Sequence, residues 1–208
     1  MTRATRDWRA DPAGSTFDET RSAILDAAEH VINESGLDGF RIAQVAARAG
    51  CTRQNVHRYF PTKRDLTEAV MSRRTQRLGR GVTRDLPEDA YPIDRLVHGI
   101  IAAVDVTLAD EHLNSYYADR SAAEMLGFLT ANVGVRSSIS RMARPLVEAL
   151  QESNPTLDEA DVADWLLRLY VAEMVWSIGS DRSEDERVRG LRLLALSPFS
   201  GVPGPTGG

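Results

Sequence analysis

The segment CTRQNVHRYF, residues 51–60, concentrates side chains that donate and accept hydrogen bonds. Its polar side chains after Thr52 are those of Arg53, Gln54, Asn55, His57 and Arg58. Arginine can form two hydrogen bonds with O6 and N7 of guanine, and glutamine or asparagine can form two with N6 and N7 of adenine. These residue types are therefore suited to contact the edges of base pairs. A solvated helix face has a similar composition, so the neighbouring residues must decide between the two interpretations.

The neighbouring residues indicate two short helices joined by a tight turn at Gly50. The first helix is predicted from apolar residues at helical spacing: Ile42, Val45, Ala46 and Ala49. Thr52 can cap the second helix, and Val56 and Phe60 would anchor it from positions one turn apart. This arrangement is a helix-turn-helix, in which the second helix enters the major groove. The polar residues would then face the bases.

A phosphate contact is predicted just after this motif. Lys63 is the only lysine of the chain, and with Arg64 it occupies the first turn of a helix capped by Thr62 and Asp65. Backbone N–H groups and positive charge at a helix N-terminus attract phosphate. Arg41, just before the first helix of the motif, is a second candidate for this contact.

Residues 20–70 resemble the DNA-binding domain of the tetracycline-repressor-like (TetR) family, which carries the pattern I-A-x-x-A-G-V-S…L-Y-x-H-F-x-x-K-x-x-L. In the same register this chain has VA at 45–46, AGCT at 49–52, VHRYF at 56–60, Lys63 and Leu66. The resemblance implies a transcriptional regulator whose partner is double-stranded operator DNA. The DNA-contacting residues it implies here are Arg41, Thr52, Arg53, Gln54, Asn55, His57, Arg58 and Lys63.

Three positions depart from the family pattern. His57 stands where the family usually has a tyrosine that contacts the DNA backbone, and histidine can change its charge near neutral pH. Gln54 replaces a small residue, and Arg41 replaces a Ser or Thr that usually caps the helix and binds phosphate. These departures bear on the operator sequence and on the pH dependence of binding.

Composition and charge narrow the class of protein. Residues 1–80 carry 14 Arg and Lys against 10 Asp and Glu, whereas residues 81–208 carry 11 against 20. An anionic partner is therefore expected for the N-terminal part only. No long apolar run predicts a membrane span, the N-terminus lacks an apolar core of a secretory signal, and the single cysteine fits a reducing compartment. We expect a cytoplasmic protein without membrane partner, metal or cofactor.

The periodicity predicts an all-α fold in two domains. A flexible arm, residues 1–15, precedes the helix-turn-helix domain of residues 16–80, in which a stop is expected at Gly36. Residues 81–196 form a helical effector-binding and dimerisation domain, and residues 197–208 form a disordered tail. Helices are expected at about 91–110, 112–131, 134–153, 157–179 and 184–196. Capping boxes at Thr156/Glu159 and Ser183/Glu186 begin the last two helices.

The last two helices are expected to form a four-helix bundle with a second copy of the chain, as the family resemblance implies. From Trp165 onward the segment ending at residue 179 is apolar almost all round, so several of its faces must be covered. The expected interface residues are Trp165, Val188, Leu191 and Leu194. A fully buried helix in a monomer is the alternative.

A small-molecule effector site is expected among residues 91–179. The candidate residues are His98, Tyr116, Tyr117, Phe128, Glu173 and Trp176, although aromatic residues at helical spacing are commonly core. Glu173 would either pair with an arginine or contact the ligand. His98, Asp105 and His112 follow one another at seven-residue spacing, but a bend near Asp110 argues against a metal site.

The function predicted from the sequence is a homodimeric, ligand-responsive repressor that binds a palindromic operator and is released by a small hydrophobic effector. An effector-independent regulator or activator is the alternative, and an all-helical enzyme is a more remote one.

Overall fold

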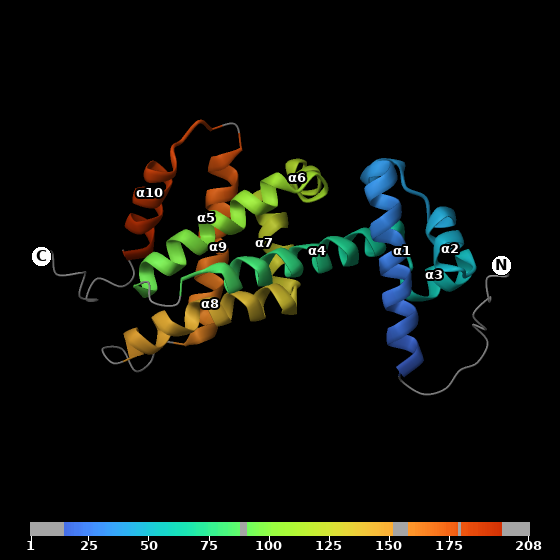
Figure 1. Ribbon diagram of the computed structural model, residues 1–208, viewed down its shortest axis with the longest axis horizontal. Helices are drawn as coiled ribbons and strands as arrows, with labels where there is room; N and C mark the ends of the chain where they lie inside the picture. Colours follow the sequence, from blue (N-terminus) through green and yellow to red (C-terminus); the bar gives the residue numbers. More distant parts are fainter. Residues whose placement is uncertain (1–14, 88–90, 152–157, 179, 197–208) are drawn as a thin grey trace, which may run out of the picture. The chain divides into compact units, whose positions relative to one another are not determined.

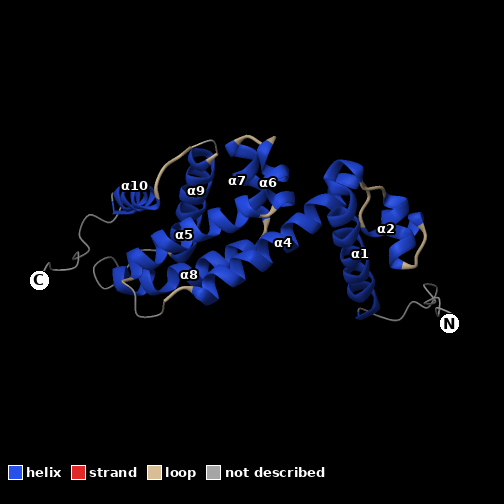
Figure 2. Cartoon of the chain, turned by 45° about the horizontal axis from the view of Figure 1, so that its top comes forward, coloured by secondary structure: helices blue, strands red, loops and turns tan. Residues whose placement is uncertain are grey.

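The computed structural model describes residues 15–87, 91–151, 158–178 and 180–196. All regular elements within these residues are α-helices, which confirms the all-α fold (Figures 1 and 2). The predicted arm and tail lie outside the described residues, apart from Ser15. The chain divides into two compact units, residues 1–74 and 75–208. This division falls inside a helix, N-terminal to the boundary expected near residue 80.

The first unit contains α1 (Ser15–Gly39), α2 (Ile42–Ala49), α3 (Arg53–Tyr59) and the beginning of α4 (Lys63–Asp85). Gly36 interrupts α1 with a φ of 71°, a left-handed conformation that glycine adopts at little cost. The predicted stop at Gly36 is therefore confirmed. The core of this unit is formed by fully buried apolar residues, among them Ile24, Ile32, Val45, Val56 and Leu66.

Gly50 and Thr52 set the turn between α2 and α3, as the sequence predicts. Gly50 adopts a φ of 71°, and its N–H donates back to the carbonyls of Ala46 and Ala47. The Thr52 hydroxyl oxygen accepts a hydrogen bond from the Asn55 N–H at 3.1 Å and so caps α3. The chain thus leaves one helix and enters the next within a few residues.

The second unit contains the end of α4 and the six helices that follow. These are α5 (Pro92–Ala109), α6 (Glu111–Ala118), α7 (Ala122–Ala131), α8 (Val133–Gln151), α9 (Glu159–Ser177) and α10 (Glu184–Leu196). The apolar helix α9 packs against α8, α5 and α7, and more lightly against α10. It therefore supplies much of the core, including Leu166, Leu167 and Met174.

One local expectation is corrected by the structure. The single helix expected over 112–131 is wrong, because Ser121 and Glu124 form a capping box: the Glu124 carboxylate accepts from the Ser121 N–H at 2.9 Å and begins α7. The helix that begins at Lys63 also continues through Gly79 and Gly81 to Asp85, beyond the domain boundary expected near residue 80. Burial of Val82 and Leu86 beyond the glycines stabilises this extension.

The start signals of the last helices have different outcomes. Ser183 and Glu186 form the predicted capping box, with the Ser183 N–H donating to the Glu186 carboxylate at 2.8 Å. The Thr156 of the other box lies outside the described residues. Asp158 caps α9 instead, through a hydrogen bond of 2.9 Å from the Ala160 N–H.

Candidate DNA-binding surface and ligand cavity

The outward face of α3 gathers the polar residues singled out in the sequence. Val56 is fully buried and Phe60 nearly so, and these two side chains hold the helix against the first unit. Thr52, Arg53, Gln54, His57 and Arg58 are exposed, and Asn55 is half-buried. Because the helix is only seven residues long, these side chains share one surface patch, which we call the α3 face.

Arg53 and Gln54 are the members of the α3 face whose side chains are available to bind another molecule. Within the part of the chain that the structure describes, neither side chain is engaged in an ion pair or hydrogen bond. Asn55 instead accepts a hydrogen bond from the Thr52 hydroxyl at 3.0 Å, which fixes the orientation of its amide. Arg58 lies 5.9 Å from the centre of the Tyr59 ring, at the distance of a cation–π contact.

The His57 ring is hydrogen-bonded to the backbone of Pro61. Its Nδ1 lies 3.1 Å from the carbonyl oxygen of Pro61, which can only accept, so Nδ1 carries the proton. In the neutral ring Nε2 then has a lone pair and can accept but not donate. A hydrogen bond from Nε2 to a phosphate oxygen therefore requires the protonated imidazolium.

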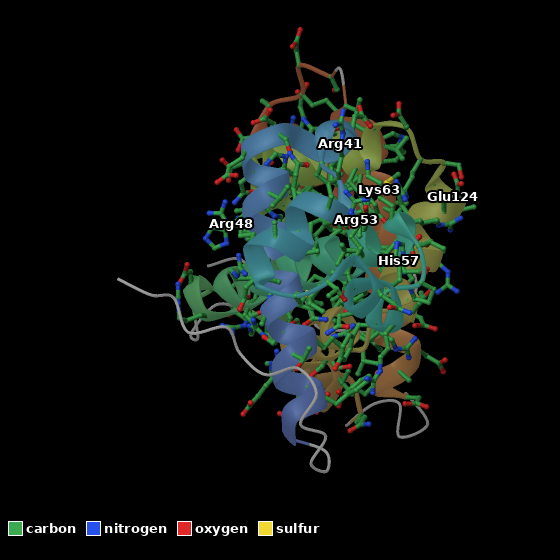
Figure 3. All side chains as sticks on the ribbon, turned by 90° about the vertical axis from the view of Figure 1, so that its right-hand side faces the viewer. Arg41, Arg48, Arg53, His57, Lys63 and Glu124 are labelled. Carbon is green, nitrogen blue, oxygen red and sulfur yellow. The ribbon has the colours of Figure 1, made fainter. Side chains whose placement is uncertain are left out.

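Lys63 and Arg41 provide exposed positive charge beside α3. In the view of Figure 3, Arg41, Lys63, Arg53 and His57 follow one another in one band, whereas Arg48 lies apart from them. The Lys63 ammonium donates to the Asp38 carbonyl at 3.1 Å and lies 4.3 Å from the centre of the Phe40 ring, so its position is fixed. Arg48 pairs with Glu34 at 2.6 Å.

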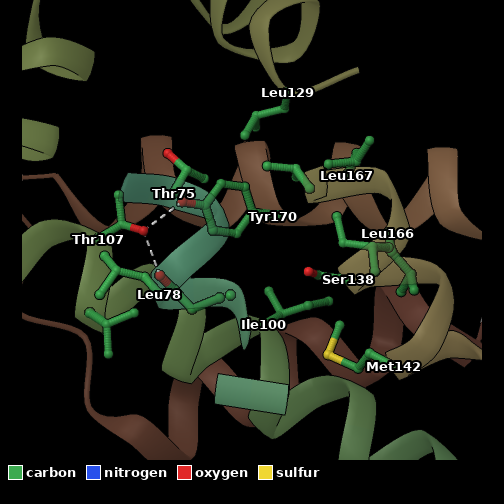
Figure 4. A pocket seen from close by; sticks show the side chains of 15 residues that line it. Thr75, Leu78, Ile100, Thr107, Leu129, Ser138, Met142, Leu166, Leu167 and Tyr170 are labelled. Atoms are coloured by element: carbon green, nitrogen blue, oxygen red, sulfur yellow. Dashed lines mark hydrogen bonds between the residues drawn. The ribbon is translucent and has the colours of Figure 1, made fainter. Parts of the chain in front are cut away.

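A partly open cavity with a volume of about 70 Å³ lies in the second unit between α4, α5, α7, α8 and α9 (Figure 4). Its walls are mainly aliphatic, with contributions from Leu78, Ile100, Met142, Leu166 and Leu167. The polar side chains on its walls are those of Thr75, Thr107, Ser138 and Tyr170. Sequence reasoning missed these residues, because isolated Thr and Ser in apolar helices look like ordinary core positions.

A chain of two hydrogen bonds runs along one wall of the cavity. The Tyr170 hydroxyl donates to Thr107 Oγ1 at 2.9 Å, and the Thr107 hydroxyl donates to the Ala103 carbonyl at 2.7 Å. Burial raises the pKa of Tyr170 to about 12, against a smaller lowering by Thr107. Tyr170 is therefore uncharged throughout the physiological pH range.

The structure places none of the six predicted ligand residues on the wall of this cavity. Tyr116, Tyr117 and Phe128 pack edge-on against one another, with ring centres 5.3–6.2 Å apart. His98 and Trp176 are exposed. The expected set therefore differs from the observed lining, because helical spacing identifies a common face but not the side on which a cavity lies.

Glu173 pairs with arginines, one of the two outcomes expected for it. Its side chain is 0% exposed and accepts from Arg187 Nε at 2.7 Å and from Arg182 Nη1 at 3.4 Å. Arg187 also contacts Asp105 of α5 at 2.7 Å. This ion cluster joins α10 to α9 and α5, and it places Asp105 in an ion pair. No group of three potential metal ligands occurs among the described residues.

The predicted interface residues lie in different environments. Leu191 is buried in its own unit at 1% exposure, so it belongs to the core instead of an open face. Trp165 and Val188 are half-buried and Leu194 is exposed. The most exposed large apolar side chains of α9, of the residue that follows it and of α10 are those of Val175, Trp176, Ile178 and Leu193. Val175 and Trp176 also border a shallow groove with Ala122, Ala123 and Leu126 of α7.

Comparison with known proteins identifies the first unit. The family model described as "Bacterial regulatory proteins, tetR family" matches residues 24–70, which include both helices of the motif and the start of α4. Residues 24–70 therefore form a DNA-binding domain of the TetR family. The chain is a transcriptional regulator and not an enzyme. None of the described helices is both long and apolar enough to cross a membrane.

Similarity extends beyond this domain. An uncharacterised HTH-type transcriptional regulator of Mycobacterium tuberculosis is 25% identical over 192 residues, covering 88% of this chain and 91% of that protein. The HTH-type transcriptional repressor KstR of Rhodococcus jostii is 23% identical, with coverage of 79% and 76%. RolR, solved in complex with resorcinol, is 18% identical and covers 91% of this chain and 97% of its own, with a TM-score of 0.62. The last similarity shows that both units have the fold seen in RolR.

Proposed function

We propose that this TetR-family regulator is a ligand-responsive repressor that works in the cytoplasm and binds a palindromic operator as a homodimer. The observation that carries the proposal is the α3 face, where Arg53 and Gln54 keep their hydrogen-bonding groups open at the exposed start of the second helix of the motif. Base edges in the major groove match these groups. Lys63 and Arg41 supply phosphate contacts, which set the position of the helix on DNA.

Homodimerisation is supported by apolar surface on α9 and α10. Trp176 and Leu193 are 50% and 75% exposed, and a large exposed aromatic next to other apolar side chains commonly marks a protein interface. A second copy would cover this surface and present a second α3 face. Two copies related by a two-fold axis would then favour a palindromic site.

The cavity of the second unit is the proposed effector site. Two proteins of similar fold were solved with ligands, RolR with resorcinol and FadR from Bacillus subtilis with stearoyl-CoA. These ligands differ widely and belong to those proteins, so the chemistry of this cavity must come from its own residues. An apolar interior with a few polar groups is typical of small-molecule sites.

Helix α4 is the proposed link between ligand and DNA. Lys63 lies in its first turn, and Thr75, Leu78 and Gly79 of the same helix line the cavity. A ligand releases DNA only if it binds the DNA-incompetent form more tightly, and a tenfold preference corresponds to about 1.4 kcal/mol.

A reporter gene tests the direction of regulation. An operator obtained by selection from random DNA is placed across the start site of a promoter, and the chain is expressed in the same cells. We expect transcription to fall with the parent chain and to recover when both Arg53→Ala and Gln54→Ala are introduced. Increased transcription with the parent would contradict repression and identify an activator, and equal transcription with the two chains would contradict regulation through α3.

A further inference from the structure

The walls of the cavity carry no charged side chain. The fifteen lining residues contain no Asp, Glu, Lys, Arg or His, and their one titratable group, Tyr170, is neutral. A carboxylate or ammonium enclosed there would lose its hydration without gaining an opposite charge, at a cost of several kcal/mol. The cavity therefore disfavours ions, including carboxylates, since no arginine or lysine on its walls could pair with them.

Most polar groups on the walls are already engaged. The Ser138 hydroxyl donates to the Gly134 carbonyl at 3.0 Å and accepts from Arg141 Nη2 at 3.1 Å. The Thr75 hydroxyl interacts with Tyr117, and this contact opposes the rise that burial causes in the pKa of Tyr117. The Thr107 hydroxyl donates a hydrogen bond to the Ala103 carbonyl and accepts one from the Tyr170 hydroxyl.

The Tyr170 oxygen can still accept a hydrogen bond from a ligand. A carbonyl oxygen can only accept, so the Thr107 proton points to Ala103, and the Tyr170 proton must point to Thr107 (Figure 4). The phenolic oxygen of Tyr170 thus presents lone pairs and no proton to a ligand. Its complement is a ligand atom that carries a hydrogen, such as a hydroxyl group.

We propose that the cavity selects a small uncharged molecule bearing a hydroxyl group, which donates its hydrogen bond to the Tyr170 oxygen. This inference rests on the proposed function, in which the cavity is the effector site, and makes Tyr170 its specificity-determining residue. An apolar cavity of about 150 Å³ holds benzene. The volume here, about 70 Å³, is less than half of that, so a single ring fits only if side chains such as the flexible Met142 move aside, and nothing larger than one small ring is expected.

Three probes with one ring each test the hydroxyl donor and the absence of charge separately. Phenol has a hydroxyl donor, toluene has the same shape without a donor, and benzoate adds a negative charge. Binding to the full chain is measured by isothermal titration calorimetry near neutral pH, without DNA. We expect phenol to bind about five- to tenfold more tightly than toluene, the range of one neutral hydrogen bond, and benzoate not to bind measurably.

Two tyrosine variants test the role of the Tyr170 oxygen. Tyr170→Phe removes the acceptor and keeps the ring, so its preference for phenol over toluene should disappear. Tyr116→Phe removes a buried hydroxyl outside the cavity lining and should keep the parent preference. Thr107→Val provides a second route if Tyr170→Phe unfolds: it frees the Tyr170 proton, so anisole, an acceptor without a donor, should gain affinity relative to phenol.

Each contrary result overturns a specific step. Benzoate binding as tightly as phenol would overturn the exclusion of ions, and an unchanged preference in Tyr170→Phe would overturn the hydrogen bond. Absence of phenol binding to the folded parent would overturn the single-ring class. Fluorescence anisotropy with operator DNA, run on the same samples, distinguishes these failures from a failure of DNA recognition.

Discussion

Lys63 and Arg48 allow the phosphate contact to be tested at the scale of single residues. Both carry one positive charge on the first unit, but Lys63 lies in the band with Arg53 whereas Arg48 lies apart from it. We expect Lys63→Ala to weaken binding to all DNA sequences and to reduce the slope of log affinity against log salt concentration by about one, because each phosphate contact releases about one counterion.

The matched control is Arg48→Ala, which removes the same charge and one exposed ion pair. Its salt slope should stay close to that of the parent, apart from a small loss of affinity through the general field. Anisotropy titrations at several salt concentrations measure both slopes. If the two variants lowered the slope equally, Lys63 would have no specific phosphate contact.

The sequence predicts the residues of the α3 face well and the cavity poorly. Val56 and Phe60 lie one turn apart, so their burial determines which side chains of a short helix point outward. Tyr170 and Thr107 come from different helices and meet only through packing of α9 on α5. Their hydrogen bond joins residues 63 positions apart in sequence, which no local pattern reveals.

At the scale of elements, the ion cluster of Glu173 attaches α10 to the second unit. The carboxylate is fully buried, and Arg187 is held both by it and by Asp105. Replacing Glu173 by Gln removes the charge but keeps the volume, and leaves Arg187 with one of its two acidic partners. We expect this variant to lose about 3 kcal/mol of unfolding free energy, as is usual when a buried ion pair is broken.

Asp164→Asn is the control on the same helix, because Asp164 pairs with Arg136 at 2.9 Å in an ion pair that is more than one-third exposed. Exposed pairs contribute little, so the loss should stay below about 1 kcal/mol. Urea denaturation followed by circular dichroism compares the two variants. Equal losses would show that the Glu173 cluster contributes no more than a surface ion pair.

Helix boundaries follow from the sequence wherever the capping residues are recognised. The boxes at Thr62/Asp65 and Ser183/Glu186 begin their helices as predicted. The box at Ser121/Glu124 has the same chemistry but lies inside a continuous helical periodicity, so the sequence pattern does not reveal the break between α6 and α7. Gly79 and Gly81 do not end α4, because packing of Val82 outweighs a helix-propensity cost of about 1 kcal/mol per glycine.

At the scale of the whole molecule, dimerisation is expected through the exposed apolar residues of α9 and α10. Trp176→Glu places a charge on this surface and should yield a monomer at micromolar concentration, where we expect the parent to sediment as a dimer. Val133→Glu is the control, since Val133 on α8 is 80% exposed but lies outside this surface. A dimeric Trp176→Glu variant with parental stability would place the interface elsewhere on the chain.

Recognition of DNA by α3 is tested most directly by selecting bound fragments from a random DNA pool and sequencing them. The parent chain should enrich a two-fold symmetric motif with half-sites about one helical turn apart, or a multiple of it. Arg53→Ala should enrich the same motif with lost preference at one position in each half-site, at a cost of about 1–3 kcal/mol in affinity for the parental motif. Enrichment of no motif by the folded parent, or an identical motif and affinity with Arg53→Ala, would contradict base recognition by this helix.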